Sequence, residues 1–231
     1  MNTFDNPAVR AKRARLSVLA TPAILGAIVL VAGCGALPDK PGRNTLYDFG
    51  PGPTSAAQTP AVPAASAPMM PLLALAEIDT NSRLEGTQLL YRLGYADANE
   101  LRPYGQSRWS MAPAQMLRQR LRDALIARHT VLGPEESATI ARTEGKTPDT
   151  LRVSLEEFSH YFPSPGASVG LVRLSATLIR SGPGGDRVLA QRIFSAQRPA
   201  PSADASGGVK GLVAATDAVV GELVAWVDMP R

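Results

Sequence analysis

The chain has 231 residues, 45% of them hydrophobic, with 24 Lys and Arg against 20 Asp and Glu. This length and composition suit one folded domain with a substantial core. Residues 1–33 hold four of the bases and one acid, so the remainder carries 20 bases (24 − 4) against 19 acids (20 − 1). This near-neutral balance excludes the basic footprint of a nucleic-acid-binding protein, and we predict no nucleic-acid partner.

The first 33 residues have the organisation of a secretory signal. Basic residues between Arg10 and Arg15 precede an apolar run over 16–31, which is shorter than the ~20 residues of a spanning helix. The run ends in Val31-Ala32-Gly33-Cys34, and Cys34 is the only cysteine. This ending resembles a bacterial lipobox, which implies cleavage before Cys34 and its acylation, including a palmitate chain. The alternative is an uncleaved signal anchor in which the cysteine has no role.

The predicted mature chain divides by composition. Residues 34–44 are rich in Pro and Gly, so we predict that they form a lipidated tether. We predict that residues 45–231 form one domain. Residues 50–71 are rich in Ala and Pro with almost no charge, so we predict a disordered loop within that domain. A recognition motif is the alternative for this loop.

Alternating apolar residues predict most of the strands. The region 151–156 alternates strictly, and Phe158 breaks its phase by one residue, which indicates a bulge. Two hairpins are predicted, one turning at 97–99 and one at 181–186. The predicted strands cover 46–49, 72–76, 89–93, 100–102, 151–156, 172–178 and 188–194.

Two long helices complete the predicted fold. The first runs from Ser110, as N-cap, to His129, and the second covers 209–227 with a broad apolar stripe. The polar segment 135–149 is ambiguous and has room for one helical turn at 138–142. We therefore predict an α+β, two-layer fold, with a mixed or antiparallel sheet of about 5–7 strands packed by two amphipathic helices.

The sequence offers little catalytic chemistry. The chain has two histidines, His129 at the end of a predicted helix and His160 at the end of a predicted strand. It contains no HExxH, GxSxG or phosphate-loop motif, so we predict no enzyme activity, no cofactor and no metal site. A dispersed Ser-His-Asp triad, as in an envelope hydrolase, remains the alternative.

Four residues around the first long helix are candidate partner contacts: Arg108, Trp109, Arg118 and Arg122. Trp and Arg are common at interface hot spots, and the helix carries an excess of arginines that suits an acidic partner or anionic lipid. The alternatives are that Trp109 anchors the helix start against the sheet and that the arginines form a solvated face.

The order of several short motifs resembles the ABC-type transport auxiliary lipoprotein family. These motifs are Arg83-Leu84, Leu90-Tyr91-Arg92, Glu100-Leu101, Tyr104 and Arg108-Trp109. Further likeness lies in Tyr47-x-Phe49, in Leu151-x-Val153 leading to Phe158, in Phe194-Ser195 and in Trp226. The resemblance implies a mixed sheet packed by two helices and a non-catalytic role in moving lipid between two membranes.

The same resemblance implies the partners, an MCE-domain periplasmic protein and its ABC transporter subunits. It also implies a protein that faces the periplasm and is held in the membrane by its N-terminal lipid. A homo-oligomer is compatible with the same resemblance. Gly35, rather than Asp, after Cys34 favours the outer membrane. The alternative is another envelope-assembly lipoprotein, such as a pilotin-like protein or a lipopolysaccharide-assembly partner.

Overall fold

A computed structural model describes residues 43–52, 71–145 and 147–230 of the chain. The predicted signal peptide and Cys34 lie outside the described residues, as do nearly all of the predicted tether and of the Ala/Pro loop. Contacts divide the chain into the units Met1–Gly42 and Arg43–Arg231, and the described residues all belong to the second unit.

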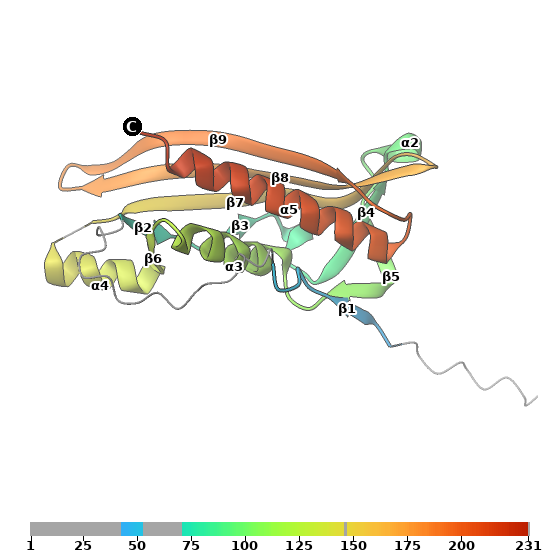
Figure 1. Cartoon of the computed structure of the whole chain (residues 1–231), viewed down its shortest axis with the longest axis horizontal. Helices are drawn as coiled ribbons and strands as arrows, with labels where there is room; N and C mark the ends of the chain where they lie inside the picture. Colours follow the sequence, from blue (N-terminus) through green and yellow to red (C-terminus); the bar gives the residue numbers. More distant parts are fainter. Residues whose placement is uncertain (1–42, 53–70, 146, 231) are drawn as a thin grey trace, which may run out of the picture. The chain divides into compact units, whose positions relative to one another are not determined.

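The described residues form one nine-stranded mixed sheet with helices, which confirms the α+β prediction (Figure 1). The strand number exceeds the predicted range because three of the nine strands have only two or three residues. The strands are β1 (Thr45–Tyr47), β2 (Leu72–Leu75), β3 (Asp79–Thr80), β4 (Gln88–Leu93), β5 (Arg102–Trp109), β6 (Thr130–Leu132), β7 (Asp149–Ser164), β8 (Ala167–Gly182) and β9 (Gly185–Pro199). The helices are η1 (Ser82–Leu84), α2 (Gly94–Asp97), α3 (Pro113–Ile126), α4 (Pro134–Glu144) and α5 (Ala205–Val227).

The 16-residue strand β7 is the centre of the sheet. Along one edge it pairs antiparallel with β8, which pairs antiparallel with β9. Along its other edge it pairs in parallel with three short strands in turn, β2, β3 and β4. Beyond these, β6 pairs with β2, while β5 and then β1 extend the sheet from β4.

The predicted bulge in β7 is confirmed. The register shifts between Leu155 and Glu157, so that Glu156 is the additional residue. Before the bulge the buried residues are Leu151, Val153 and Leu155; after it Phe158, His160 and Phe162 are buried in alternation, and Ser159 between them is buried as well. The bulge thus returns the next residues of the strand to the core side of the sheet.

Helices α5 and α3 lie side by side against the sheet, and α5 packs on β8 and β9 (Figure 1). Asp204 caps α5, because its Oδ1 accepts the Gly207 N–H at 2.7 Å. The helix therefore begins four residues before the predicted start. Its predicted apolar stripe is buried, apart from the half-buried Val213.

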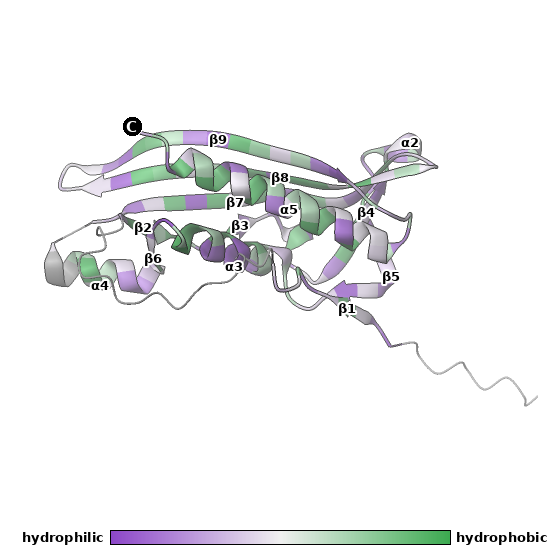
Figure 2. Cartoon of the chain, in the orientation of Figure 1, coloured by the Kyte–Doolittle hydropathy of each residue, from purple (hydrophilic) through white to green (hydrophobic). Residues whose placement is uncertain are grey.

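The prediction of Ser110 as the cap of α3 is wrong. The helix begins at Pro113, its N-cap is Ala112 without a side-chain capping bond, and it ends at Ile126 rather than His129. Proline at the first helical position costs no hydrogen bond, which explains the start. Leu117, Leu121 and Leu125 are buried as the periodicity predicts, and hydrophilic residues recur along the rest of the helix (Figure 2).

The first predicted hairpin is present with different boundaries. β4 and β5 pair antiparallel, but the connection contains the helical turn α2, and β5 continues to Trp109. The sequence did not predict β6, and α4 is longer than the single turn expected at 138–142. Pro134 is the first residue of α4.

Candidate functional site

Trp109 is the last residue of β5 and lies in the core, with 1% of its surface exposed. Its ring packs edge-on against Phe49, with centroids 5.7 Å apart, and against Phe158 at 5.5 Å. This placement favours the packing interpretation over a surface contact, because the side chain is not available to a partner.

The three arginines proposed with Trp109 make different contacts. The half-buried Arg108 donates hydrogen bonds to the backbone carbonyls of Tyr104 and Ser107. Arg118 forms an ion pair with Glu77 at 3.2 Å. The half-buried Arg122 makes no ion pair within the part of the chain that the structure describes.

The other arginines of the α3 region hold the fold together. Arg120 donates to the Phe49 carbonyl and lies 3.4 Å from Asp217 of α5, so it joins α3, α5 and the segment after β1. Arg128 donates to Asp228 at 2.6 Å. Because these cations are paired within the domain, the charge excess seen in the sequence is largely neutralised.

A cavity of about 300 Å³ lies where the start of β2 meets β8, β9 and the end of α5. Its polar rim consists of two ion pairs, Arg128–Asp228 and a bidentate Arg180–Asp149 pair at 2.8 Å, together with His129. The apolar lining residues are Leu72, Leu73, Leu178, Leu189, Val227 and Met229. Since both arginines are already paired, the rim offers no uncommitted cation for an anionic ligand.

His129 and Asp228 form a second bond at this cavity, with Nε2 lying 2.8 Å from Oδ1. Burial by itself would raise the pKa of Asp228, but the hydrogen bonds from His129 and Arg128 outweigh it and lower that pKa. The imidazole is buried, and its Nδ1 has no partner among the described residues. This pair fixes the end of α5 against the residues that follow α3.

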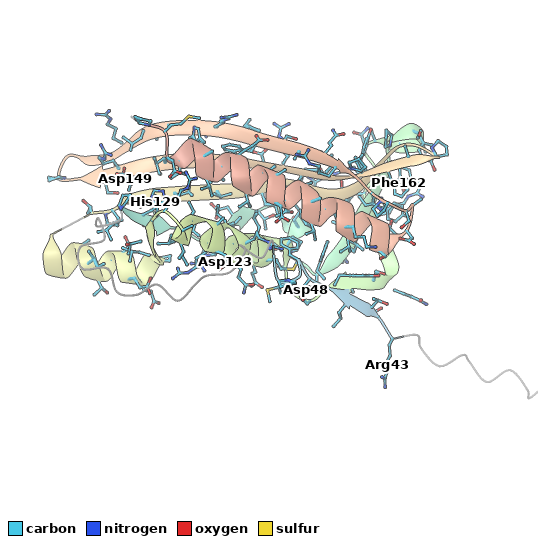
Figure 3. All side chains as sticks on the ribbon, in the orientation of Figure 1. Arg43, Asp48, Asp123, His129, Asp149 and Phe162 are labelled. Atoms are coloured by element: carbon cyan, nitrogen blue, oxygen red, sulfur yellow. The ribbon has the colours of Figure 1, made fainter. Side chains whose placement is uncertain are left out.

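The second histidine was predicted at the end of a strand, and this prediction is wrong. His160 lies within β7 and is fully buried, with Nδ1 2.8 Å from the Tyr104 hydroxyl and its ring beside Gly208 of α5. Figure 3 shows that Phe162, two residues beyond it, lies at the opposite end of the sheet from His129. The two histidines therefore belong to separate sites.

Burial determines the protonation states of His160 and Tyr104. It lowers the pKa of His160 to about 4, despite the opposing charge of Asp204. It also raises the pKa of Tyr104 to about 12, with further contributions from Tyr91 and Asp204. Both side chains are thus neutral near pH 7, as a packed polar pair in the core requires.

A pH titration tests this assignment. Unfolded His160 titrates near 6.5, so the unfolded chain binds the proton first as the pH falls, and stability must drop between roughly pH 6.5 and pH 4. We expect the free energy of unfolding to fall by about 2 kcal/mol between pH 7 and pH 5 from this group alone. Urea denaturation at the two pH values measures it, and His160→Gln should remove that component. Equal losses in the variant and the parent chain would contradict the assignment.

Two further observations concern metal binding and membrane spanning. Across residues 43–52, 71–145 and 147–230, no group of three or more His, Cys, Asp or Glu side chains is placed to bind a metal ion. None of the helices in these same ranges is both long enough and apolar enough to cross a bilayer. The sequence did not predict the His129–Asp228 and His160–Tyr104 pairs. The alternation of Phe158, His160 and Phe162 was the signal that could have placed His160 in the core.

Comparisons with known proteins agree with this architecture. Protein XCC0632 from Xanthomonas campestris superposes with a TM-score of 0.60 at 20% identity, covering 79% of this chain and 94% of that one. The crystal structure of an uncharacterized protein superposes with a TM-score of 0.55 at 16% identity, covering 81% of this chain and all of that one. At these identities the likeness shows the fold alone. No curated protein matches the sequence.

The sequence itself supplies the family. Residues 54–225 match the model of the ABC-type transport auxiliary lipoprotein component, which spans most of the chain and nearly all of the described strands and helices. The chain therefore belongs to the family of ABC-type transport auxiliary lipoprotein components.

Proposed function

We propose that the protein is the auxiliary lipoprotein of an ABC/MCE-type transporter that moves lipids between the inner and outer membranes. In this role it is held by acylated Cys34 in the outer membrane, faces the periplasm and binds the periplasmic MCE-domain protein. The observation that carries the proposal is the family match over residues 54–225. The lipobox-like sequence ending at Cys34 supports the anchor.

The cavities favour a role through protein contact over lipid carriage. Pockets for drug-sized ligands span roughly 300–1,000 Å³. The cavity beside His129 holds about 300 Å³, a second one beside Arg120 about 160 Å³, and a third, lined by β6 and α4, about 530 Å³. A lipid with two acyl chains is larger than a drug-sized ligand, so none of these three cavities can enclose one. The domain would act by holding transporter components in place.

Co-purification tests this function. The acylated chain, extracted from envelopes in a neutral detergent, is expected to bring down an MCE-domain protein together with its ABC subunits. A Cys34→Ala chain should not be acylated, and it is expected to be lost from the outer-membrane fraction. Recovery of a folded domain with none of these partners would overturn the proposal and favour a pilotin-like or lipopolysaccharide-assembly role.

The same experiment tests the predicted contact through α3. Arg118 and Arg122 lie on the helix, and their double replacement by alanine removes two charges without opening the core. Loss of the complex from a folded double variant would place the contact on α3. Recovery equal to that of the parent chain would remove this surface from the proposal.

A further inference from the structure

The strand β9 leaves one edge of the sheet open. It pairs with β8 only, and no other strand of the described residues covers its second edge. In an antiparallel pair, alternate residues direct their backbone N–H and C=O groups away from the neighbouring strand. Across the 15 residues Gly185–Pro199 these groups form a long row that can accept a further strand.

The charges of β9 differ from those of its neighbour. Both arginines of β8 are paired, Arg173 with Glu156 and Arg180 with Asp149, each at 2.8 Å. The three arginines of β9 are Arg187, Arg192 and Arg198, all exposed, and none forms an ion pair with a described residue. The single acid of the strand, Asp186, accepts a hydrogen bond from Ser181. The open edge therefore carries uncompensated positive charge.

The arginines are ordered along the strand. Arg192 and Arg198 are six residues apart, so both lie on the face that carries the buried Phe194 and Ala196. Arg192 is held over the Phe194 ring, with its guanidinium carbon 5.0 Å from the ring centroid. On the opposite face Ile193 is 54% exposed. The edge thus presents cations on one face and an apolar side chain on the other.

We propose that the open edge of β9 binds an extended acidic segment of a partner protein as an additional strand. Its acidic side chains would meet Arg192 and Arg198, and alternate apolar side chains would cover Ile193. Backbone hydrogen bonds supply affinity in such strand addition, and the alternate side chains supply specificity. The proposal rests on the docking role given above and names the surface that performs it.

Charge also argues against a second copy of β9 as the occupant. Two β9 strands paired edge to edge would bring six arginines together with only two acids. Like charges that face each other across a strand pair are destabilising. The arginines therefore disfavour self-pairing and favour an acidic partner.

Peptide binding to the full chain in neutral detergent tests the inference. The probe is a fluorescent peptide of alternating Glu and Val, about ten residues long, which is the upper length of common strands. We expect salt-sensitive binding, measured by anisotropy, and slower amide exchange in β9, measured by mass spectrometry. R192E/R198E should weaken binding about tenfold, since exposed ion pairs contribute up to about 1 kcal/mol each. The control R83E/R152E makes the same charge change at two exposed arginines outside β9 and should bind as the parent does.

Each outcome separates this inference from the proposed function. Equal binding of a Lys-Val peptide, or equal loss in the control variant, would overturn the β9 assignment. Recovery of the MCE complex from R192E/R198E at parental levels would overturn it as well, while leaving the proposed function intact. Peptide protection of β9 without recovery of any MCE complex would retain the edge site and reject the transporter role.

Discussion

Replacing Trp109 by alanine is expected to destabilise the domain by about 4 kcal/mol, as large truncations of buried aromatic residues do. The side chain is 1% exposed and joins two parts of the core, Phe49 after β1 and Phe158 just beyond the bulge of β7. Its backbone N–H also bonds the Thr87 carbonyl at 2.8 Å, which fixes the ring position. Truncation would leave a large cavity where these segments meet.

Denaturation followed by circular dichroism measures this loss without using Trp109 itself as the probe. Trp109→Phe should cost much less, because it keeps most of the ring contact and removes an indole N–H that has no partner among the described residues. Arg108→Ala, at the half-buried neighbouring position, is the second control and should cost under about 1 kcal/mol. A Trp109→Ala chain as stable as these two would contradict the core assignment.

The same pair of variants decides how Trp109 affects partner binding. If the residue acts only through the fold, Trp109→Phe should recover as much complex as the parent chain. Trp109→Ala should recover less, in proportion to its unfolded fraction. Loss of the complex from a fully stable Trp109→Phe chain would instead return Trp109 to the list of direct contacts.

The long strands could be predicted because one face of each is buried. Alternation in β7, β8 and β9 is a direct consequence of core packing, and the break at Phe158 correctly indicated the bulge. The short strands could not be predicted in the same way. β6 has three residues, which is too few for a period to show, and it forms only because β2 lies beside it.

Local rules failed where tertiary contacts decide the outcome. Ser110 is a good capping residue, yet its N–H bonds the Tyr47 carbonyl, which places it beside β1 rather than on the helix. His160 was expected at a strand end, but β7 continues to Ser164. Phe158, His160 and Phe162 are alternate residues of β7. Extending the inward-facing alternation from Phe158 to Phe162 would have predicted that His160 lies in the core.

The candidate site was harder to predict than the fold. Sequence spacing indicated an excess of arginines on α3, but their partners Glu77, Asp217 and Asp228 are distant in the chain. Which charges remain uncompensated is a property of the folded surface. The unpaired arginines of β9 became distinctive only when the arginines of β8 were seen to be paired.

Helix α5 and the sheet approach each other closely at Gly170, and Gly170→Ala is expected to cost about 3 kcal/mol, the upper end for overpacking. Gly170 of β8 lies opposite His160 and Arg198 in the sheet. A Cβ placed there would lie 2.1 Å from the backbone of Gly211 and Leu212 in α5. Backbone atoms cannot rotate away as a side chain can, so α5 would have to lift from β8 and expose Leu212 and His160, both fully buried.

Gly221→Ala provides a matched control in the same helix. A Cβ at Gly221 meets no atom within 4 Å, and the position is exposed. Alanine there should stabilise the domain by about 1 kcal/mol, because glycine is a poor helix former. Denaturation of the two variants should therefore give changes of opposite sign. A Gly170→Ala chain as stable as its parent would mean that α5 packs less tightly on β8, and the burial that keeps His160 neutral would then need another cause.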